Sequence, residues 1–271
     1  MPPDREPLPF DVRDALPFLE GEGWRDSARH GLESALGLTR VREIFREAAA
    51  RDGERFAEAF AGFGLRAAGQ DFATAIPESG PVVVMANHPF GGADALALGT
   101  LCTARRADTL MLANEMAAQV VPGPGEAMIP LSILGGEGSA RKNAPSLRRA
   151  LEHLRNGGLL AVFPSGEVAS WKGSAVEEGP WSPHVAALAL KSKATLVTVR
   201  FFGKTPFWFH LAGGIHPLVR TALLPRVLLG MHGQAVHCRA KRMERGDVAS
   251  MGAEEAVAFL REWTLKIAER E

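Results

Sequence analysis

The stretch that most constrains the fold is an apolar hexapeptide, residues 81–86, followed directly by a polar turn. A short Val-rich run of this kind is typical of a strand that is buried on both faces of a sheet. The turn reads Asn-His-Pro-Phe-Gly-Gly-Ala-Asp, residues 87–94, and an apolar run with the composition of a buried helix follows at residues 95–101. Strand, glycine turn and helix in this order predict an α/β unit with polar residues at the ligand-binding edge of its sheet.

Strand and helix signals alternate from residue 76 onward, which predicts an α/β domain over residues 76–271. The predicted strands span residues 82–86, 109–113, 127–131, 159–163, 195–202 and 234–239, and the predicted helices span residues 95–103, 144–155, 185–191 and 253–269. Between residues 24 and 66 the apolar residues have helical spacing, and two or three helices are expected. We therefore assign residues 1–75 to an N-terminal helical element.

The composition excludes several classes of protein. Hydrophobic residues make up 46% of the chain and charged residues 23%, as in globular proteins rather than disordered ones. Two cysteines, Cys102 and Cys238, are too few for a disulfide framework and favour a reducing compartment. The first twenty residues hold five acids and no apolar core, and no uninterrupted apolar run reaches about 18 residues. Neither a signal peptide nor a transmembrane helix is predicted.

The formal net charge of zero conceals an uneven distribution. Residues 1–71 hold 14 acidic and 10 basic side chains, whereas residues 180–243 hold nine Lys or Arg and no acid. An acid-free segment of this length predicts a face that meets anions, such as phosphate headgroups, an anionic carrier or nucleic acid. The alternative is a solvated basic face without a partner.

Residues 206–231 are apolar and aromatic and are interrupted by Pro217, Arg220, Pro225 and Arg226. These interruptions exclude a spanning helix. They fit a segment at a lipid boundary, with aromatic side chains toward the lipid and arginines toward phosphates. A buried loop that crosses the sheet fits equally well, and the sequence does not decide between the two.

Two turns carry the chemistry. His88 and Asp94 share the first, and a histidine beside a carboxylate that fixes its tautomer is a general-base arrangement. Because the turn has no nucleophile of its own, we expect a substrate hydroxyl to attack. The second follows the apolar run at residues 160–163 and reads Pro164-Ser165-Gly166-Glu167. Its backbone N–H groups and the hydroxyls of Ser165 and Ser170 are suited to hold a phosphate or another oxyanion.

The two turns together resemble motifs of the glycerolipid acyltransferases. That family has Asn-His, four residues and Asp, and further along Phe-Pro-Glu-Gly-Thr-Arg-Ser. Here five residues separate His88 from Asp94, and the second block reads Phe-Pro-Ser-Gly-Glu-Val-Ala-Ser over residues 163–170. Both departures resemble the hemolysin-like branch, which includes lyso-ornithine-lipid acyltransferases. The resemblance covers about residues 65–245.

The resemblance implies a glycerol-3-phosphate acyltransferase-like fold, a central mixed sheet with flanking helices, and an activity. A fatty acyl group would pass from a thioester of coenzyme A or acyl carrier protein to a lysolipid hydroxyl, with no further cofactor and no metal. His88 would be the base and Asp94 would orient it. The implied substrate-binding residues are Asn87, Gly91, Gly92, Pro164, Ser165, Gly166 and Glu167, with turn amides near Gly91–Gly92 or Gly166 as oxyanion donors.

Partners and location follow from the same resemblance. We expect a cytoplasmic protein at the inner face of the membrane, with a lysolipid, a thioester carrier and the membrane surface as partners and no nucleic acid. Glu167 and Val168 stand where the family usually has Thr and a phosphate-binding Arg, which favours an amine-bearing headgroup. Arg141 or Lys142 is expected to be the basic residue that binds the headgroup. Thr198 replaces the usual proline of the fourth block.

Two alternatives stay open from the sequence. One is a lipase-like or thioesterase-like hydrolase, in which water uses the same His88–Asp94 pair. The other is a non-catalytic module that binds a lipid or a carrier. Residues 135–139 lack the third glycine of a dinucleotide fingerprint, and Ser165 lacks the Gly-x-Ser-x-Gly context of a hydrolase elbow. The other histidines are scattered without metal-ligand spacing.

Overall fold

The computed structural model describes residues 21, 23–115, 127–132, 139–171, 173, 175–210 and 217–269. Its centre is a seven-stranded sheet in the order β1-β9-β8-β2-β5-β3-β4. The strands are β1 (Arg66–Gln70), β2 (Val82–Ala86), β3 (Thr109–Asn114), β4 (Met128–Leu131), β5 (Leu159–Val162), β8 (Thr195–Phe201) and β9 (Ala235–Met243). All neighbouring pairs are parallel except β8 and β9. The predicted mixed sheet with flanking helices is therefore confirmed.

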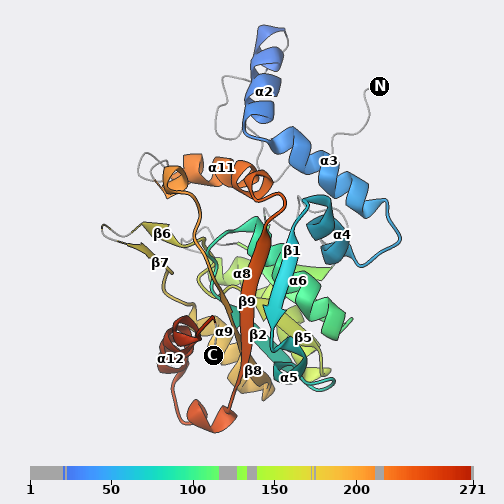
Figure 1. The fold of residues 1–271 in the computed structure, drawn as a ribbon. Coiled ribbons are helices and arrows are strands. Elements are labelled where there is room, and N and C mark those ends of the chain that lie inside the picture. Colours follow the sequence, from blue (N-terminus) through green and yellow to red (C-terminus); the bar gives the residue numbers. More distant parts are fainter. Residues whose placement is uncertain are drawn as a thin grey trace.

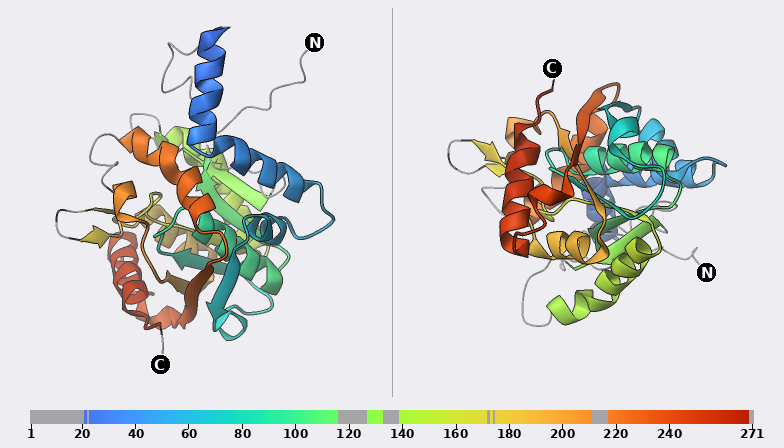
Figure 2. Two further views of the ribbon diagram at one scale, coloured as in Figure 1. Left: turned by 45° about the horizontal axis from the view of Figure 1, so that its top comes forward. Right: turned by 90° about the horizontal axis from the view of Figure 1, so that it is seen from below.

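Helices cover both faces of this sheet (Figures 1 and 2). On one face lie α3 (Leu38–Ala49), α4 (Arg55–Gly62), α5 (Phe72–Ala75) and α6 (Gly92–Arg105), and on the other lie α8 (Ser139–Arg155), α9 (Pro183–Ser192) and α12 (Ala253–Lys266). Every residue of β2 is buried. Val82, Val84 and Ala86 pack on the α6 side and Val83 and Met85 on the α9 side. This two-sided burial explains why β2 is continuously apolar.

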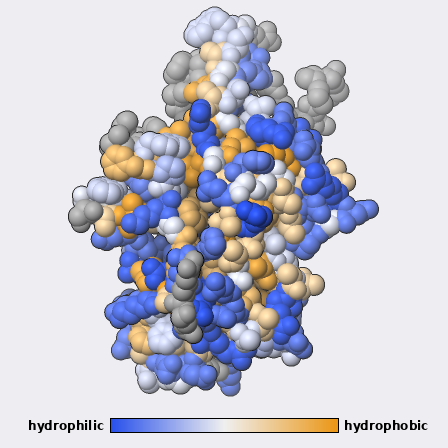
Figure 3. Space-filling model, viewed as in Figure 1, coloured by the Kyte–Doolittle hydropathy of each residue, from blue (hydrophilic) through white to orange (hydrophobic). Residues whose placement is uncertain are grey.

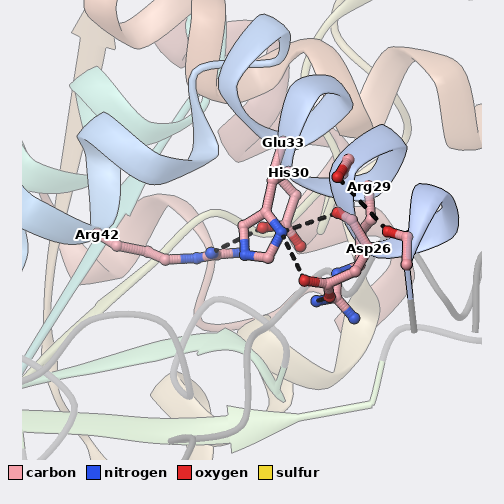
Figure 4. Close-up of polar contacts among 7 residues, drawn as sticks. Asp26, Arg29, His30, Glu33 and Arg42 are labelled. Carbon is pink, nitrogen blue, oxygen red and sulfur yellow. Dashed lines mark hydrogen bonds and ion pairs between the residues drawn. The ribbon is translucent and has the colours of Figure 1, made fainter. Parts of the chain in front are cut away.

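The N-terminal helices α2 (Trp24–Ala35) and α3 join through Gly37, which has a left-handed φ of 78°. Polar side chains link the two helices (Figure 4): Arg42 of α3 donates to Glu33 of α2 at 3.2 Å. Within α2, Arg29 pairs with Asp26, and His30 contacts the backbone oxygen of the same residue at 2.8 Å. Charge pairing therefore connects α2 to α3, which in turn packs on the α/β core.

Residues 217–230 form helix α11 (Pro217–Gly230), where the sequence suggested a lipid-boundary segment or a crossing loop. Pro217 stands at the first helical position, where its fixed φ suits a helix, although Pro225 lies inside it. Arg226 donates to the backbone oxygen of Ala35, so α11 packs against the α2–α3 corner, as Figure 1 shows. Residues 211–216 lie outside the described residues.

Other elements differ from the sequence expectation. Residues 66–70 belong to the predicted helical element, yet they form β1, which pairs in parallel with β9. The strand has four exposed residues out of five, and at the edge of a sheet it needs only one partner and no apolar face. A small hairpin of β6 (Ser170–Trp171) and β7 (Val176–Glu177) and a 3₁₀ turn η3 (Arg245–Asp247) were also not predicted. Among the described helices, none is long and apolar enough to cross a bilayer.

The contact between α4 and α6 depends on a glycine. A methyl group on Gly99 would lie 2.3 Å from the ring of Phe56, which is fully buried. We expect Gly99→Ala to lower the free energy of unfolding by about 1–3 kcal/mol, because overpacking displaces the ring. Thermal and urea unfolding measure this. Gly31→Ala in α2 is the matched control: a Cβ there meets nothing within 4 Å, so its helix propensity can only improve. Equal stability of the two variants would contradict the packing described.

At least four of the nine basic side chains in residues 180–243 form hydrogen bonds or ion pairs within the protein. Arg200 donates to the backbone oxygen of Ile267 at 2.7 Å, and Arg242 to that of Ala75 at 2.9 Å. Arg239 pairs with Asp71 at 2.5 Å, and Arg226 bonds to Ala35, as described above. Much of the acid-free charge therefore stabilises chain ends and turns, which weakens the case for one continuous anion-binding face.

Candidate active site

Asn87 connects the end of β2 to β8. Its amide nitrogen donates to the backbone oxygen of Phe201 at 3.1 Å, and its amide oxygen accepts the backbone N–H of Phe201 at 2.7 Å. The side chain thus imitates one more rung of the sheet and is buried. These two bonds fix the point at which the chain leaves the sheet, one residue before His88.

His88 and Asp94 face each other across the turn. Nδ1 of His88 lies 3.0 Å from Oδ1 of Asp94, an ion-pair distance, although the two atoms do not meet the angle of a linear hydrogen bond. Oδ2 of Asp94 accepts the backbone N–H of Phe90 at 2.8 Å. The carboxylate is fully buried in the first turn of α6, where the helix dipole favours negative charge. It is therefore held in place to orient the imidazole.

The ring of His88 is held on one face by Phe163, with ring centroids 4.0 Å apart and planes at 27°. Its side chain is 15% exposed, and among the described residues none bonds to its second ring nitrogen, Nε2. Burial opposes the imidazolium, but the charges of Asp94 and Glu178 and the interaction with Asp94 outweigh it and raise the pKa of His88. The histidine thus has one nitrogen directed at a carboxylate and one available for a substrate proton.

The second turn lies beside the first because β5 pairs with β2. The backbone N–H of Ala169 donates to the backbone oxygen of His88 at 2.9 Å, and Pro164 accepts the N–H of Ser182 at 2.9 Å. The hydroxyl of Ser165 donates to the backbone oxygen of Glu167 at 2.9 Å. The two stretches that carried the resemblance are therefore joined at the carboxyl ends of adjacent parallel strands.

The backbone N–H of Gly166, one of the expected oxyanion donors, already forms a hydrogen bond within its own turn. The N–H of Gly166 donates to the backbone oxygen of Phe163 at 3.0 Å, which closes the turn around the positive φ of Gly166. Gly91 and Gly92 open helix α6, and the first N–H groups of a helix have no intrahelical partner. The start of α6 is therefore the better oxyanion site. Methyl groups on Gly91 and Gly92 would lie 2.9 Å and 3.1 Å from side chains of α11, which lies directly over this turn.

Arg141 and Lys142, the two candidates for a basic headgroup contact, lie near the start of α8. Nζ of Lys142 lies 2.8 Å from Glu115, which follows β3, and 3.4 Å from the hydroxyl of Ser132, which follows β4. In the sheet, β3 and β4 lie two and three positions from β2, so this lysine is not beside the histidine turn. The side chain of Arg141 is exposed.

Glu178 was not singled out from the sequence. It is 7% exposed, and its carboxylate accepts the backbone N–H of His88 at 3.1 Å and the indole N–H of Trp181 at 3.2 Å. Burial raises the pKa of Glu178, although these donors favour the charged form. The local signal was the Gly-Pro pair at residues 179–180 that follows it, which suggests a bend in the chain but not which residue Glu178 contacts.

A comparison with protein families covers both turns. The sequence model of the family described as Acyltransferase matches residues 71–201. The match runs from α5 through β8 and contains both turns. No curated protein sequence matches the chain.

Within the described residues, no group of three His, Cys, Asp or Glu side chains is placed to hold a metal ion.

A solved structure shares the fold. The crystal structure of the 1-acyl-sn-glycerophosphate (LPA) acyltransferase PlsC from Thermotoga maritima is similar, with a TM-score of 0.50 and 16% sequence identity. The similarity covers 85% of this chain and 85% of that chain. At this identity the likeness establishes a common architecture, and the chemistry has to be argued from the residues of the site.

Proposed function

We propose that this protein transfers a fatty acyl group from an acyl thioester, carried by coenzyme A or acyl carrier protein, to the hydroxyl of a lysolipid. The observation that carries the proposal is the His88–Asp94 pair, with 3.0 Å between Nδ1 and Oδ1, inside the segment that matches the Acyltransferase family. The PlsC-like architecture supports it. The turn contains no Ser or Cys that could form a covalent intermediate, so the acceptor itself is the nucleophile.

The proposed step begins when Nε2 of His88 removes the proton from the lysolipid hydroxyl as its oxygen attacks the thioester carbonyl. The N–H groups at Gly91 and Gly92 bind the oxyanion that develops. When the carbon–sulfur bond breaks, the imidazolium returns the proton to the leaving thiolate. The products are an ester and a free thiol. Asp94 stabilises the imidazolium between these two transfers.

The acceptor is proposed to carry an amine in its headgroup, as in the hemolysin-like branch. Val168, where the family usually has an arginine, packs with Phe209 and with Val227 of α11, so this position offers no charge to a phosphate. Glu167 is exposed and offers a carboxylate. Lys142 is paired with Glu115 and remains the candidate for any phosphate contact.

A panel of lysolipids with labelled acyl-coenzyme A and labelled acyl carrier protein tests the proposal. We expect a lyso-ornithine lipid to gain the label faster than lysophosphatidate. A preference for lysophosphatidate would reject the headgroup assignment and keep the acyl transfer. No labelled lipid from any acceptor would reject the function itself.

The membrane contact is proposed to include an aromatic patch of Trp171, Phe207 and Trp208. These side chains are 45%, 67% and 46% exposed, and the rings of Trp171 and Phe207 meet edge to face at 5.9 Å. Phe209, next in the chain, packs with Val168, which connects the patch to the end of the second turn. Tryptophan prefers the interface between membrane and water. Figure 3 also shows hydrophobic residues gathered where α11 meets the N-terminal helices.

Replacing Trp171 and Phe207 together by serine is expected to weaken binding to phosphatidylglycerol vesicles by at least about tenfold, because each ring contributes about 1.5–3 kcal/mol when it leaves water. Co-sedimentation measures the partition coefficient. Trp263→Ser on α12 removes another exposed indole and serves as the matched control, with binding unchanged. Loss of binding in the control alone would assign the membrane face to α12. Wild-type binding is also expected to weaken as salt increases.

A further inference from the structure

We propose that Glu178 is a positioning residue that sets the backbone of the catalytic histidine turn. The inference rests on the proposed function and adds a residue that the motifs do not contain. Asp94 holds the imidazole at Nδ1, and Glu178 holds the same residue at its backbone nitrogen. His88 is therefore fixed at two atoms by two buried carboxylates from distant parts of the chain.

The contacts of Glu178 come from three directions. One carboxylate oxygen accepts the N–H of His88 at 3.1 Å, and the other accepts the indole N–H of Trp181 at 3.2 Å. Its backbone oxygen accepts from Arg261 of α12, which also donates to the oxygen of Gly179 at 2.9 Å. Glu178 thus joins the histidine turn, the segment that leads into α9 and helix α12.

A purely structural carboxylate would be an unfavourable choice at this position. A charge that is 7% exposed loses most of its hydration, and a neutral side chain could satisfy a single N–H donor. Two N–H donors on two different oxygens require a group that only accepts, which is a carboxylate. Its negative charge also favours the imidazolium of His88, which forms during the reaction. Position and charge together suit the catalytic step.

The ionisable groups around the histidine are few. Asp94 faces the imidazole from α6, Glu178 faces the backbone from the segment after β7, and Cys238 of β9 interacts with Asp94. The pKa of the Cys238 thiol is raised by burial to about 12, so it stays neutral near pH 7. Near neutral pH the imidazole therefore responds to the two carboxylates.

Glu178→Gln tests the proposal because glutamine has the same shape but one acceptor oxygen and no charge. We expect kcat to fall by about 10- to 100-fold with KM for donor and acceptor within about twofold of wild type. The acidic limb of kcat/KM is expected to move to lower pH, because one charge that favours the imidazolium is gone. Nuclear magnetic resonance of labelled histidine checks the same shift of the His88 pKa without turnover.

Two variants complete the design. Glu178→Asp keeps the charge on a shorter side chain, so the pH limb is expected to return toward wild type while kcat stays reduced. Glu177→Gln is the matched control: the neighbouring carboxylate is exposed, and its loss is expected to change neither kcat nor the pH limb. If Glu178→Gln does not fold, Trp181→Phe removes one of the two donors, and kcat is expected to fall several-fold.

The outcomes separate the two claims. Wild-type kcat and an unmoved pH limb in Glu178→Gln would overturn the positioning role, as would wild-type kcat in Trp181→Phe if the glutamine variant is unfolded. Each variant is compared with His88→Ala in the same assay. A wild-type protein that acylates no lysolipid would reject the proposed function instead. Activity that needs His88 but is indifferent to Glu178 would reject only the positioning role.

Discussion

Replacing His88 with alanine is expected to lower kcat for acyl transfer by about 100- to 10,000-fold, the usual contribution of a positioned general base. The backbone of the turn is held by hydrogen bonds of Asn87, Glu178 and Ala169 that do not involve the imidazole, so the fold should survive its removal. Initial rates with labelled acyl thioester and saturating lysolipid measure the effect. His184→Ala, an exposed histidine at the start of α9, is the matched control and should keep wild-type kcat. Full activity in His88→Ala would leave the protein as a binding module or an enzyme that uses another base.

The proposed role of His88 also predicts how the activity of the wild-type protein depends on pH. A general base must be neutral before it accepts a proton, so kcat/KM should rise with pH and level off above the pKa of His88. Because the carboxylates of Asp94 and Glu178 outweigh burial, that pKa lies above the ordinary value of 6.5. A profile that is already flat below pH 6.5 would contradict this environment.

Replacing Asp94 with asparagine should have an effect nearly as large, about 100- to 10,000-fold in kcat. The variant keeps an oxygen for the Phe90 N–H, but its amide nitrogen would then face Nδ1 of His88. A donor in that place favours the wrong tautomer, and no negative charge remains to stabilise the imidazolium. The acidic limb of kcat/KM should also move to lower pH.

Glu255→Gln is the matched control for Asp94→Asn. Glu255 is an exposed carboxylate in the first turn of α12, so its loss also removes a favourable helix-dipole interaction, but far from the histidine. We expect wild-type kcat in this control. An Asp94→Asn enzyme as active as the control would show that the imidazole does not need its buried carboxylate.

The fold could be predicted where local sequence alone determines burial. Residues 82–86 matched the expected strand residue for residue because both faces of that strand are covered, so every position is apolar. β1 could not be found in this way. Its sequence, Arg-Ala-Ala-Gly-Gln, has no apolar alternation, and the strand exists because the edge of β9 offers it hydrogen bonds. The sequence did not predict helix α11, because Pro225 and Arg226 interrupt its apolar pattern. The helix packs on Gly91 and Gly92, a tertiary contact that local sequence does not reveal.

The residues of the site also differ in how far the sequence could predict them. His88 and Asp94 are six positions apart in one turn, so strand, glycine pair and helix already indicate that they meet. Glu178 is 90 positions beyond His88, and only the assembled chain brings its carboxylate to that backbone N–H. The N–H of Gly166 closes its own turn, a local hydrogen bond that the sequence did not reveal. The sequence thus indicated the proposed catalytic pair, and the structure showed the contacts that hold it.

The measurement that tests direct acyl transfer most plainly is a rapid-quench experiment with labelled acyl thioester, with and without lysolipid, that follows where the label goes. We expect no label on the protein and little free fatty acid without acceptor, and labelled lipid that appears with thiol release when acceptor is added. Label that accumulates covalently on the protein, or fatty acid that forms at a rate no acceptor suppresses, would contradict attack by a lipid hydroxyl activated by His88.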